Sequence, residues 1–167
     1  MTRSSQDAFY AHLPRKRVGA GALITDGQGR ILIVEPTYKP TWEIPGGIVE
    51  VGETAPGACA RELREELGLE FVIGRLLVIE DQTDPGIRGD SLMFVYDGGL
   101  LTDPAGIRLD PAELKRFALV PQEELAMRTT PKLARRLGHA VAARAEGILV
   151  ELENGLRRIH QEPGPGS

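Results

Sequence analysis

Residues 47–69 read GIVEVGETAPGACARELREELGL. Within this stretch Glu62, Glu65 and Glu66 are spaced i, i+3 and i+4, which places three carboxylates on one face of a helix. Like charges so close together repel one another, so a solvated helix gains nothing from the grouping, whereas a divalent cation would turn the repulsion into binding energy. Carboxylate oxygens suit hard cations such as Mg2+ and Mn2+. The stretch therefore predicts metal-dependent chemistry.

The same residues predict a helix over 55–67. Thr54 is a good N-cap residue, Pro56 is tolerated in the first turn, and Gly68 is a typical C-cap residue. Leu63 and Leu67 mark an apolar side opposite the glutamates. The helix is therefore expected to pack on a core with one side and to present its carboxylates on the other.

As a whole, the stretch resembles the signature of the Nudix hydrolases, G-x5-E-x7-R-E-U-x-E-E-x-G-U, in which U is a bulky aliphatic residue. The matching positions are Gly47, Glu53, Arg61, Glu62, Leu63, Glu65, Glu66, Gly68 and Leu69. Every fixed position of the signature is matched, and nine specified positions at fixed spacing are a strong signal. The resemblance extends upstream into WEIPGG at 42–47 and, more loosely, covers residues 17–143.

Patterns on either side predict alternating strands and helices. Strands are expected at 18–24, 30–35, 91–100 and 116–120 and within 70–81, with a short extended piece at 42–44 and irregular chain at 46–54. Helices are expected at 121–127 and 131–146, and a hairpin over 148–159 around Asn154-Gly155. This order indicates an α/β fold with a mixed sheet between helices, which the resemblance specifies as the Nudix α/β/α sandwich.

Bulk properties set the domain organisation. A chain of 167 residues has the length of one domain, expected over 17–160, with a partly ordered N-terminal arm at 1–16 and a disordered tail at 161–167. The net charge of -4 gives no general attraction to nucleic acid. The lack of a long apolar run and of a signal peptide predicts a cytoplasmic protein without membrane contact. The oligomeric state stays open; dimers are common in the family, so a homodimer is one option.

The resemblance implies a reaction and a set of roles. The reaction is hydrolysis of a diphosphate linkage in a small-molecule nucleoside diphosphate derivative, with Mg2+ as cofactor and Mn2+ as the alternative. Arg61 is expected to hold a glutamate through a bidentate pair, and Glu53 to support the loop and helix. The implied metal ligands are the Gly46 carbonyl, Glu62, Glu65 and Glu66.

The general base stays open. It is either a glutamate of the box, Glu65 or Glu66, or Glu113, which precedes a predicted strand where a later glutamate often serves in relatives. Glu113 is equally consistent with an ordinary loop carboxylate, and geometry decides which group reaches a water. Weaker candidates are Glu80, Asp81 and Glu124.

Substrate contacts are the least specified part of the sequence. Lys39 and Arg88 are candidates, although both are also consistent with solvated side chains. Trp42 is expected in the core rather than stacked on a base. Cys59 is interpreted as a structural thiol, since no partner histidine is placed near it. A basic stripe on the last helix is expected to be solvated and consists of Arg135, Arg136 and Arg144.

Two alternatives use the same scaffold. One is a non-catalytic sensor that binds a nucleotide or nucleotide sugar, which the intact signature disfavours. The other is an isomerase or an mRNA-decapping enzyme, and the acidic net charge does not support the RNA-binding surface that decapping needs.

Overall fold

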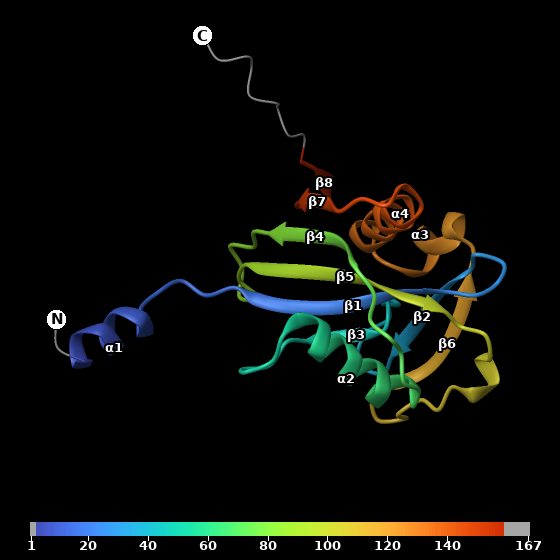
Figure 1. Cartoon of the computed structure of the whole chain (residues 1–167), viewed down its shortest axis with the longest axis horizontal. Helices are drawn as coiled ribbons and strands as arrows, with labels where there is room; N and C mark the ends of the chain where they lie inside the picture. Colours follow the sequence, from blue (N-terminus) through green and yellow to red (C-terminus); the bar gives the residue numbers. More distant parts are fainter. Residues whose placement is uncertain (1–2, 159–167) are drawn as a thin grey trace, which may run out of the picture.

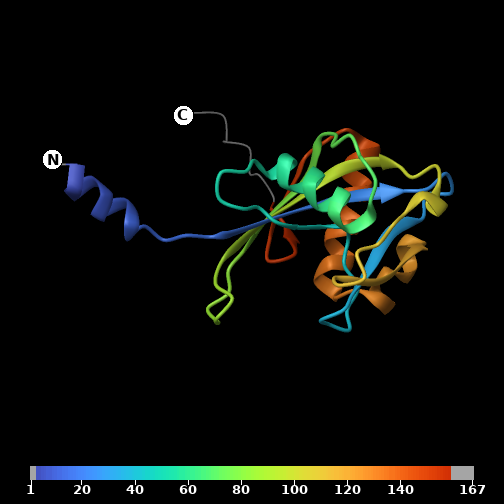
Figure 2. The ribbon, with the colours of Figure 1, turned by 90° about the horizontal axis from the view of Figure 1, so that it is seen from below.

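The computed structural model describes residues 3–158. The predicted tail at 161–167 and the last two residues of the predicted domain lie outside this range. Within the arm predicted over 1–16, α1 (Arg3–Ala11) is a helix that stands away from the body of the molecule (Figures 1 and 2). Over residues 3–158, no helix has both the length and the apolar character needed to cross a bilayer.

A mixed sheet forms the centre of the body, in the order β6-β2-β1-β5-β4-β7-β8, with β3 also paired to β1. β1 is parallel to β5 and β4 is parallel to β7, while the remaining pairs are antiparallel. The strands are β1 (Arg17–Thr25), β2 (Ile31–Pro36), β3 (Gly46–Ile48), β4 (Leu76–Gln82), β5 (Ser91–Leu100), β6 (Leu114–Val120), β7 (Val150–Glu153) and β8 (Leu156–Arg157).

Helices cover both faces of this sheet. α2 (Ala55–Leu67) lies on one face, and α3 (Leu125–Arg128) and α4 (Pro131–Glu146) lie on the other (Figure 1). Short 3-10 turns, η1 (Pro104–Gly106) and η2 (Gln122–Glu124), complete the elements. Each face has its own apolar cluster, with Leu63 and Leu67 in one and Leu133 and Leu137 in the other. The predicted α/β/α sandwich is confirmed.

β1 changes its antiparallel neighbour along its length. It pairs with β2 only where Thr25 faces Ile31, at the base of the hairpin. Its earlier residues pair with β3 instead, with Gly19 opposite Ile48 and Gly21 opposite Gly46. The prediction of irregular chain at 46–54 is therefore wrong for β3, because the departure of β2 leaves an edge of β1 free to pair. The predicted extended piece at 42–44 forms only isolated bridges.

Local capping explains the bounds of α2. The Thr54 side chain accepts a hydrogen bond from the Gly57 amide at 3.2 Å, and Gly68 ends the helix with φ 66°. At the other end of the chain, Asn154 and Gly155 have φ of 49° and 86°. Positive φ at both central residues is the geometry of the predicted two-residue hairpin turn.

The stripe predicted to be solvated on α4 is wrong for two of its three arginines. Arg136 is 7% exposed and forms an ion pair with the fully buried Glu80. Arg144 donates to the Leu23 carbonyl and pairs with Asp97 at 2.7 Å. α4 packs on β4, so this face of the helix is turned to the sheet, and paired arginines are tolerated there.

Candidate active site

Two glycines allow β3 to lie between β1 and α2. Gly46 has φ 141°, and a Cβ at this position would lie 2.3 Å from the Ala20 carbonyl oxygen. A Cβ at Gly47 would lie 2.3 Å from the Glu62 carboxylate. Real Cβ atoms essentially never make contacts so short, so β3 approaches β1 at Gly46 and the acidic helix at Gly47 as closely as only glycine allows.

Arg61 binds three carboxylates of the signature. Its Nε and Nη2 donate to the two oxygens of Glu53 at 2.8 and 3.0 Å, which is the predicted bidentate pair. Its Nη1 donates to Glu62 and to Glu65, each at 3.0 Å. The Arg61 guanidinium holds the pKa of Glu53 at about 2, well below its usual value. The Glu50 amide donates to the same carboxylate at 3.0 Å, so Glu53 also supports the loop before α2.

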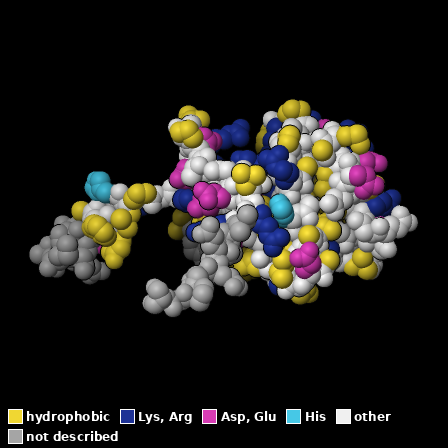
Figure 3. Space-filling model, turned by 90° about the horizontal axis from the view of Figure 1, so that it is seen from above, with side chains coloured by type: hydrophobic (Ala, Val, Ile, Leu, Met, Phe, Trp, Pro, Cys, Tyr) yellow, Lys and Arg dark blue, Asp and Glu magenta, His cyan; other side chains and the backbone are white. Residues whose placement is uncertain are grey.

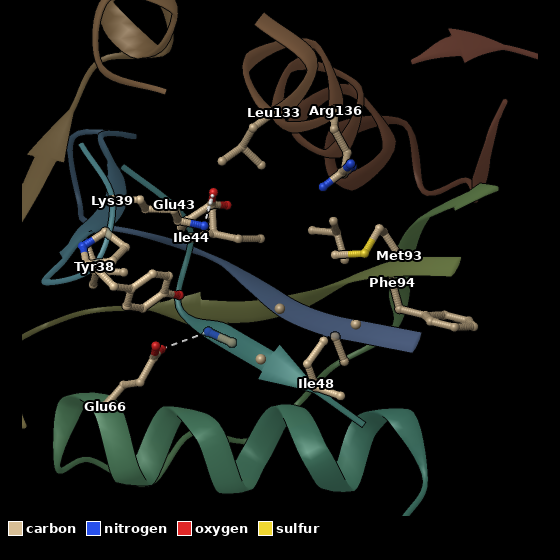
Figure 4. Close-up of a pocket in the computed structure, with 18 residues that line it drawn as sticks. Tyr38, Lys39, Glu43, Ile44, Ile48, Glu66, Met93, Phe94, Leu133 and Arg136 are labelled. Atoms are coloured by element: carbon tan, nitrogen blue, oxygen red, sulfur yellow. Dashed lines mark hydrogen bonds and ion pairs between the residues drawn. The ribbon is translucent and has the colours of Figure 1, made fainter. Parts of the chain in front are cut away.

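Glu66 is the buried carboxylate of the group. It is 7% exposed and accepts a hydrogen bond from the Gly46 amide at 2.9 Å, drawn as a dashed line in Figure 4. Burial raises its pKa to about 8; the Gly46 amide opposes this shift, and the charges of Glu62 and Glu113 add to it. Burial also raises the pKa of Glu62. Burial therefore makes both of these carboxylates, which lie one turn apart on α2, costly to ionise without a counter-charge.

The chemistry of these donors fits a hard divalent cation. Across residues 3–158, no three acidic, His or Cys side chains are grouped so that they could hold one ion. The reason is visible in the contacts: Arg61 binds Glu62 and Glu65, and Glu66 turns to the Gly46 amide. A cation would bind through rotation of these side chains, and its charge would offset the cost of ionising Glu62 and Glu66.

A cavity of about 200 Å3 opens beside this group. Its walls come from both helical layers, with Glu66 from α2 on one side and Leu133 and Arg136 from α4 on the other (Figure 4). Gly46 and Met93 lie between them. The cavity lies where β1 exchanges β2 for β3, so the change of strand partner opens the space next to the acidic helix.

The substrate-contact candidates both line cavities. Lys39 borders this cavity and forms an ion pair with Glu43 at 2.8 Å. Arg88 borders a neighbouring groove of about 960 Å3. Trp42 is 7% exposed, which confirms its predicted place in the core.

The candidates for the general base are separated by their surroundings. Glu113 is exposed just before β6, and its charge raises the pKa of both Glu62 and Glu66. Glu80 is fully buried against Arg136, so it is not placed to receive a proton from a water. Asp81 pairs with Lys16. Glu113, Asp81 and Glu124 all lie outside the walls of the two cavities, and of these three Glu113 is the one whose charge acts on Glu62 and Glu66.

Two further observations concern residues near the site. Cys59 is buried, and burial together with the charges of Glu66 and Glu62 raises the pKa of its thiol to about 12, as expected of a structural thiol. Lys132 and Arg136, which border the groove, were not among the predicted site residues. Their i, i+4 spacing on α4 was the available signal, but spacing alone does not show which face meets a cavity.

Comparison with known proteins identifies the family. The family model described as the NUDIX domain matches residues 15–141. A MutT-like protein of Streptomyces ambofaciens is 32% identical over 44% of this chain and 48% of its own length. The putative 8-oxo-dGTP diphosphatase 2 of Mycobacterium tuberculosis (strain H37Rv) is 47% identical over 50% of this chain and 60% of its own. The chain thus spans about half the length of these curated relatives.

A solved structure supports the same assignment. The MutT protein from Methanosarcina mazei Go1 has a TM-score of 0.65 and 25% identity, covering 81% of this chain and 98% of its own. The similarity therefore covers most of the chain and is not confined to the acidic helix.

Proposed function

The chain belongs to the Nudix family, and from this premise we propose that it hydrolyses a diphosphate linkage in a nucleoside diphosphate-X substrate. Mg2+ is the proposed cofactor, with Mn2+ as the alternative. The observation that carries the proposal is the position of Glu66, a buried carboxylate with a raised pKa, at the wall of a cavity and next to Glu62. Perturbed carboxylates that face a cavity are typical of catalytic sites.

The proposed ligand set keeps the sequence-based assignment. The Gly46 carbonyl, Glu62, Glu65 and Glu66 would hold the cation. When bound, it neutralises the diphosphate oxygens and lowers the pKa of a water. Around it, the Gly46 amide orients the Glu66 carboxylate, and Arg61 keeps the loop before α2 joined to the helix through Glu53.

Substrate would enter through the cavity between α2 and α4. Lys39 and Arg88 are proposed to contact anionic oxygens of the substrate, which suits their places on the walls. Glu113 is proposed as the group that accepts the proton of the attacking water, because it is exposed and close enough to influence Glu62 and Glu66. Glu65 is the alternative, since 55% of its side chain is exposed on the same helix. Glu66 is a further candidate for the general base, although it is buried.

One experiment tests the reaction. The protein is incubated with Mg2+ and a panel of nucleotide sugars, dinucleoside polyphosphates and nucleoside triphosphates, and the release of nucleotide or phosphate is measured. Glu66→Gln should lower turnover by roughly 10²-fold or more, as expected for a lost metal ligand. Glu70→Gln is the matched control, because that side chain is 73% exposed and, among residues 3–158, its ion pair is with Arg64 at 3.5 Å. Binding of a panel member without any turnover would favour the sensor over the enzyme.

The general base has its own readout. If Glu113 accepts the proton, Glu113→Gln lowers kcat and removes the acidic limb of the pH-rate profile. If the pH-rate profile is unchanged in Glu113→Gln and changed in Glu65→Gln, the general base is Glu65 on α2.

The remaining predictions accompany this proposal. A cytoplasmic setting and a small-molecule substrate, with no nucleic acid or membrane partner, are part of it. A homodimer stays a prediction, which sedimentation equilibrium of the full chain would decide.

A further inference from the structure

The groove next to the cavity has a charge opposite to that of the whole protein. The two spaces share Met93, Leu133 and Arg136 among their walls, so the groove of about 960 Å3 continues the cavity. The acidic residues on its wall are Glu43 and Asp84. The basic ones are Arg17, Lys39, Arg88, Lys132 and Arg136. A local excess of basic side chains in a chain of net charge -4 favours an anion at this place.

Arg136 is the buried member of this set. Its side chain is 8% exposed, and its Nε donates to Glu80, which fixes the guanidinium. Among residues 3–158, neither terminal nitrogen of Arg136 forms a hydrogen bond with another residue. Figure 4 shows the guanidinium extending from α4 towards the cavity. These two nitrogens are not among the fully buried atoms that lack a partner, so they reach the open space of the cavity and are available to an acceptor that enters it.

The N-terminus of α4 adds to the same site. Thr130 caps this helix of 16 residues, accepting from the Leu133 amide at 3.2 Å, and Thr130, Lys132 and Leu133 all border the groove. The positive end of the helix dipole therefore faces the space that Arg136 enters. Figure 3 views the α4 side of the molecule, where Lys and Arg side chains gather over the middle of the face.

We propose that Lys132, Arg136 and the N-terminus of α4, here named the α4 anion subsite, bind a phosphate group that the substrate carries outside its diphosphate linkage. This phosphate is additional to the diphosphate that is cleaved next to Glu66. A guanidinium with both terminal nitrogens free offers the two parallel donors that a phosphate accepts. A neutral carbonyl would need only one donor and would leave the charge of Lys132 unused. The inference rests on the proposed function and narrows its substrates to those that carry a phosphate group besides the diphosphate.

The test uses matched substrates that share a diphosphate linkage and differ by one phosphate group. NADP+ is compared with NAD+, and coenzyme A with dephospho-coenzyme A, and kcat/KM is measured for each. The phosphorylated member of at least one pair should be preferred by about 10- to 100-fold, the range expected for hydrogen bonds to a charged group. Arg136→Gln and Lys132→Gln should each reduce this ratio, whereas Arg135→Gln, which removes an exposed charge from the same helix, should preserve it.

A second variant guards against a folding defect. Arg136→Gln leaves Glu80 buried without its partner, so the double variant Glu80→Gln/Arg136→Gln removes both charges together. The ratio should fall in the double variant too, with the folded state checked by its melting curve. A ratio that survives in a folded double variant would overturn the inference.

Different results would refute the α4 anion subsite and the proposed hydrolase function. Glu66-dependent cleavage of NAD+ or dephospho-coenzyme A without any preference for the phosphorylated member would refute the subsite and leave the hydrolase standing. If neither these four compounds nor the substrates of the earlier panel are cleaved, the proposed hydrolase function is refuted. Calorimetric titration with NADP+ and coenzyme A then tests the α4 anion subsite by itself. Binding that is weakened by Arg136→Gln supports it, and absence of Arg136-dependent binding refutes it.

Discussion

Replacing Glu66 with glutamine should stabilise the metal-free protein at alkaline pH, even though it removes a proposed metal ligand. Burial raises the pKa of Glu66 from 4.5 to about 8, so the folded state binds its proton more tightly than the unfolded state does. This contribution to stability is fully present below pH 4.5 and is lost as the pH rises through about 8. Glutamine has no proton to lose, so the variant escapes the loss.

The size of the effect follows from the shift. A difference of about 3.5 pKa units corresponds to roughly 5 kcal/mol as an upper bound, since each unit is about 1.4 kcal/mol. The free energy of unfolding of Glu66→Gln, relative to that of the wild type, should therefore increase by a few kcal/mol between pH 5 and pH 9. Glutamine can still accept from the Gly46 amide, so the hydrogen bond is kept.

The assay is urea unfolding with EDTA present, at pH 5, 7 and 9, for the wild type, Glu66→Gln and the exposed control Glu70→Gln. Melting curves with added Mg2+ at pH 8 provide the second half: the wild type should gain stability from the cation, and Glu66→Gln should gain much less. A difference between Glu66→Gln and the wild type that stays constant from pH 5 to 9 would show that burial does not govern this carboxylate. An equal response of both proteins to Mg2+ would remove Glu66 from the ligand set.

Three further predictions follow from the same region. Gly46→Ala should destabilise the fold by about 3 kcal/mol or more, because its Cβ would meet backbone of β1 at a positive φ; Gly47→Ala should cost less stability but weaken Mg2+ binding by roughly 10- to 100-fold, because its Cβ meets only a movable carboxylate. Urea unfolding measures the stability of both variants, and titration with Mg2+ measures their metal affinity, so the two effects can be told apart. Arg61→Lys should raise the pH of acid unfolding, followed by circular dichroism, since the Glu53 contribution is present above pH 4.5 and is lost as the pH falls towards 2. Cys59 should react with a disulfide reagent at pH 8 roughly 10³-fold more slowly in the native protein than in urea; comparable rates would contradict its burial.

Elements that depend on local signals were predicted well from the sequence. The helices Ala55–Leu67 and Pro131–Glu146 and the strand Ser91–Leu100 have the predicted bounds. The two helices begin at Thr54 and Thr130, whose side chains cap the first turn, and end at glycines with positive φ. Caps act within a few residues of chain, so their effect can be recognised without knowing the rest of the fold.

What the sequence did not reveal depends on residues that are distant in the chain. β3 exists because β2 leaves β1, and the burial of Arg136 depends on Glu80, 56 residues away. A basic stripe on an amphipathic helix resembles a solvated face until the partner strand is known. The acidic cluster was predicted as a group, but the sequence did not indicate that Arg61 would contact Glu53, Glu62 and Glu65 at once.

That three-way contact bears on when the protein can fold. Acidic clusters that wait for a cation often keep a chain unfolded until metal arrives, because their repulsion opposes compaction. Here Arg61 lies on the same helix as Glu62 and Glu65, so it supplies an internal counter-ion as soon as the helix forms. Synthesis and folding should therefore proceed independently of the cellular metal supply. The cation then binds after folding, and it competes with the Arg61 guanidinium for the carboxylates of Glu62 and Glu65. The occupancy of the metal site can therefore follow the free metal concentration while the protein stays folded.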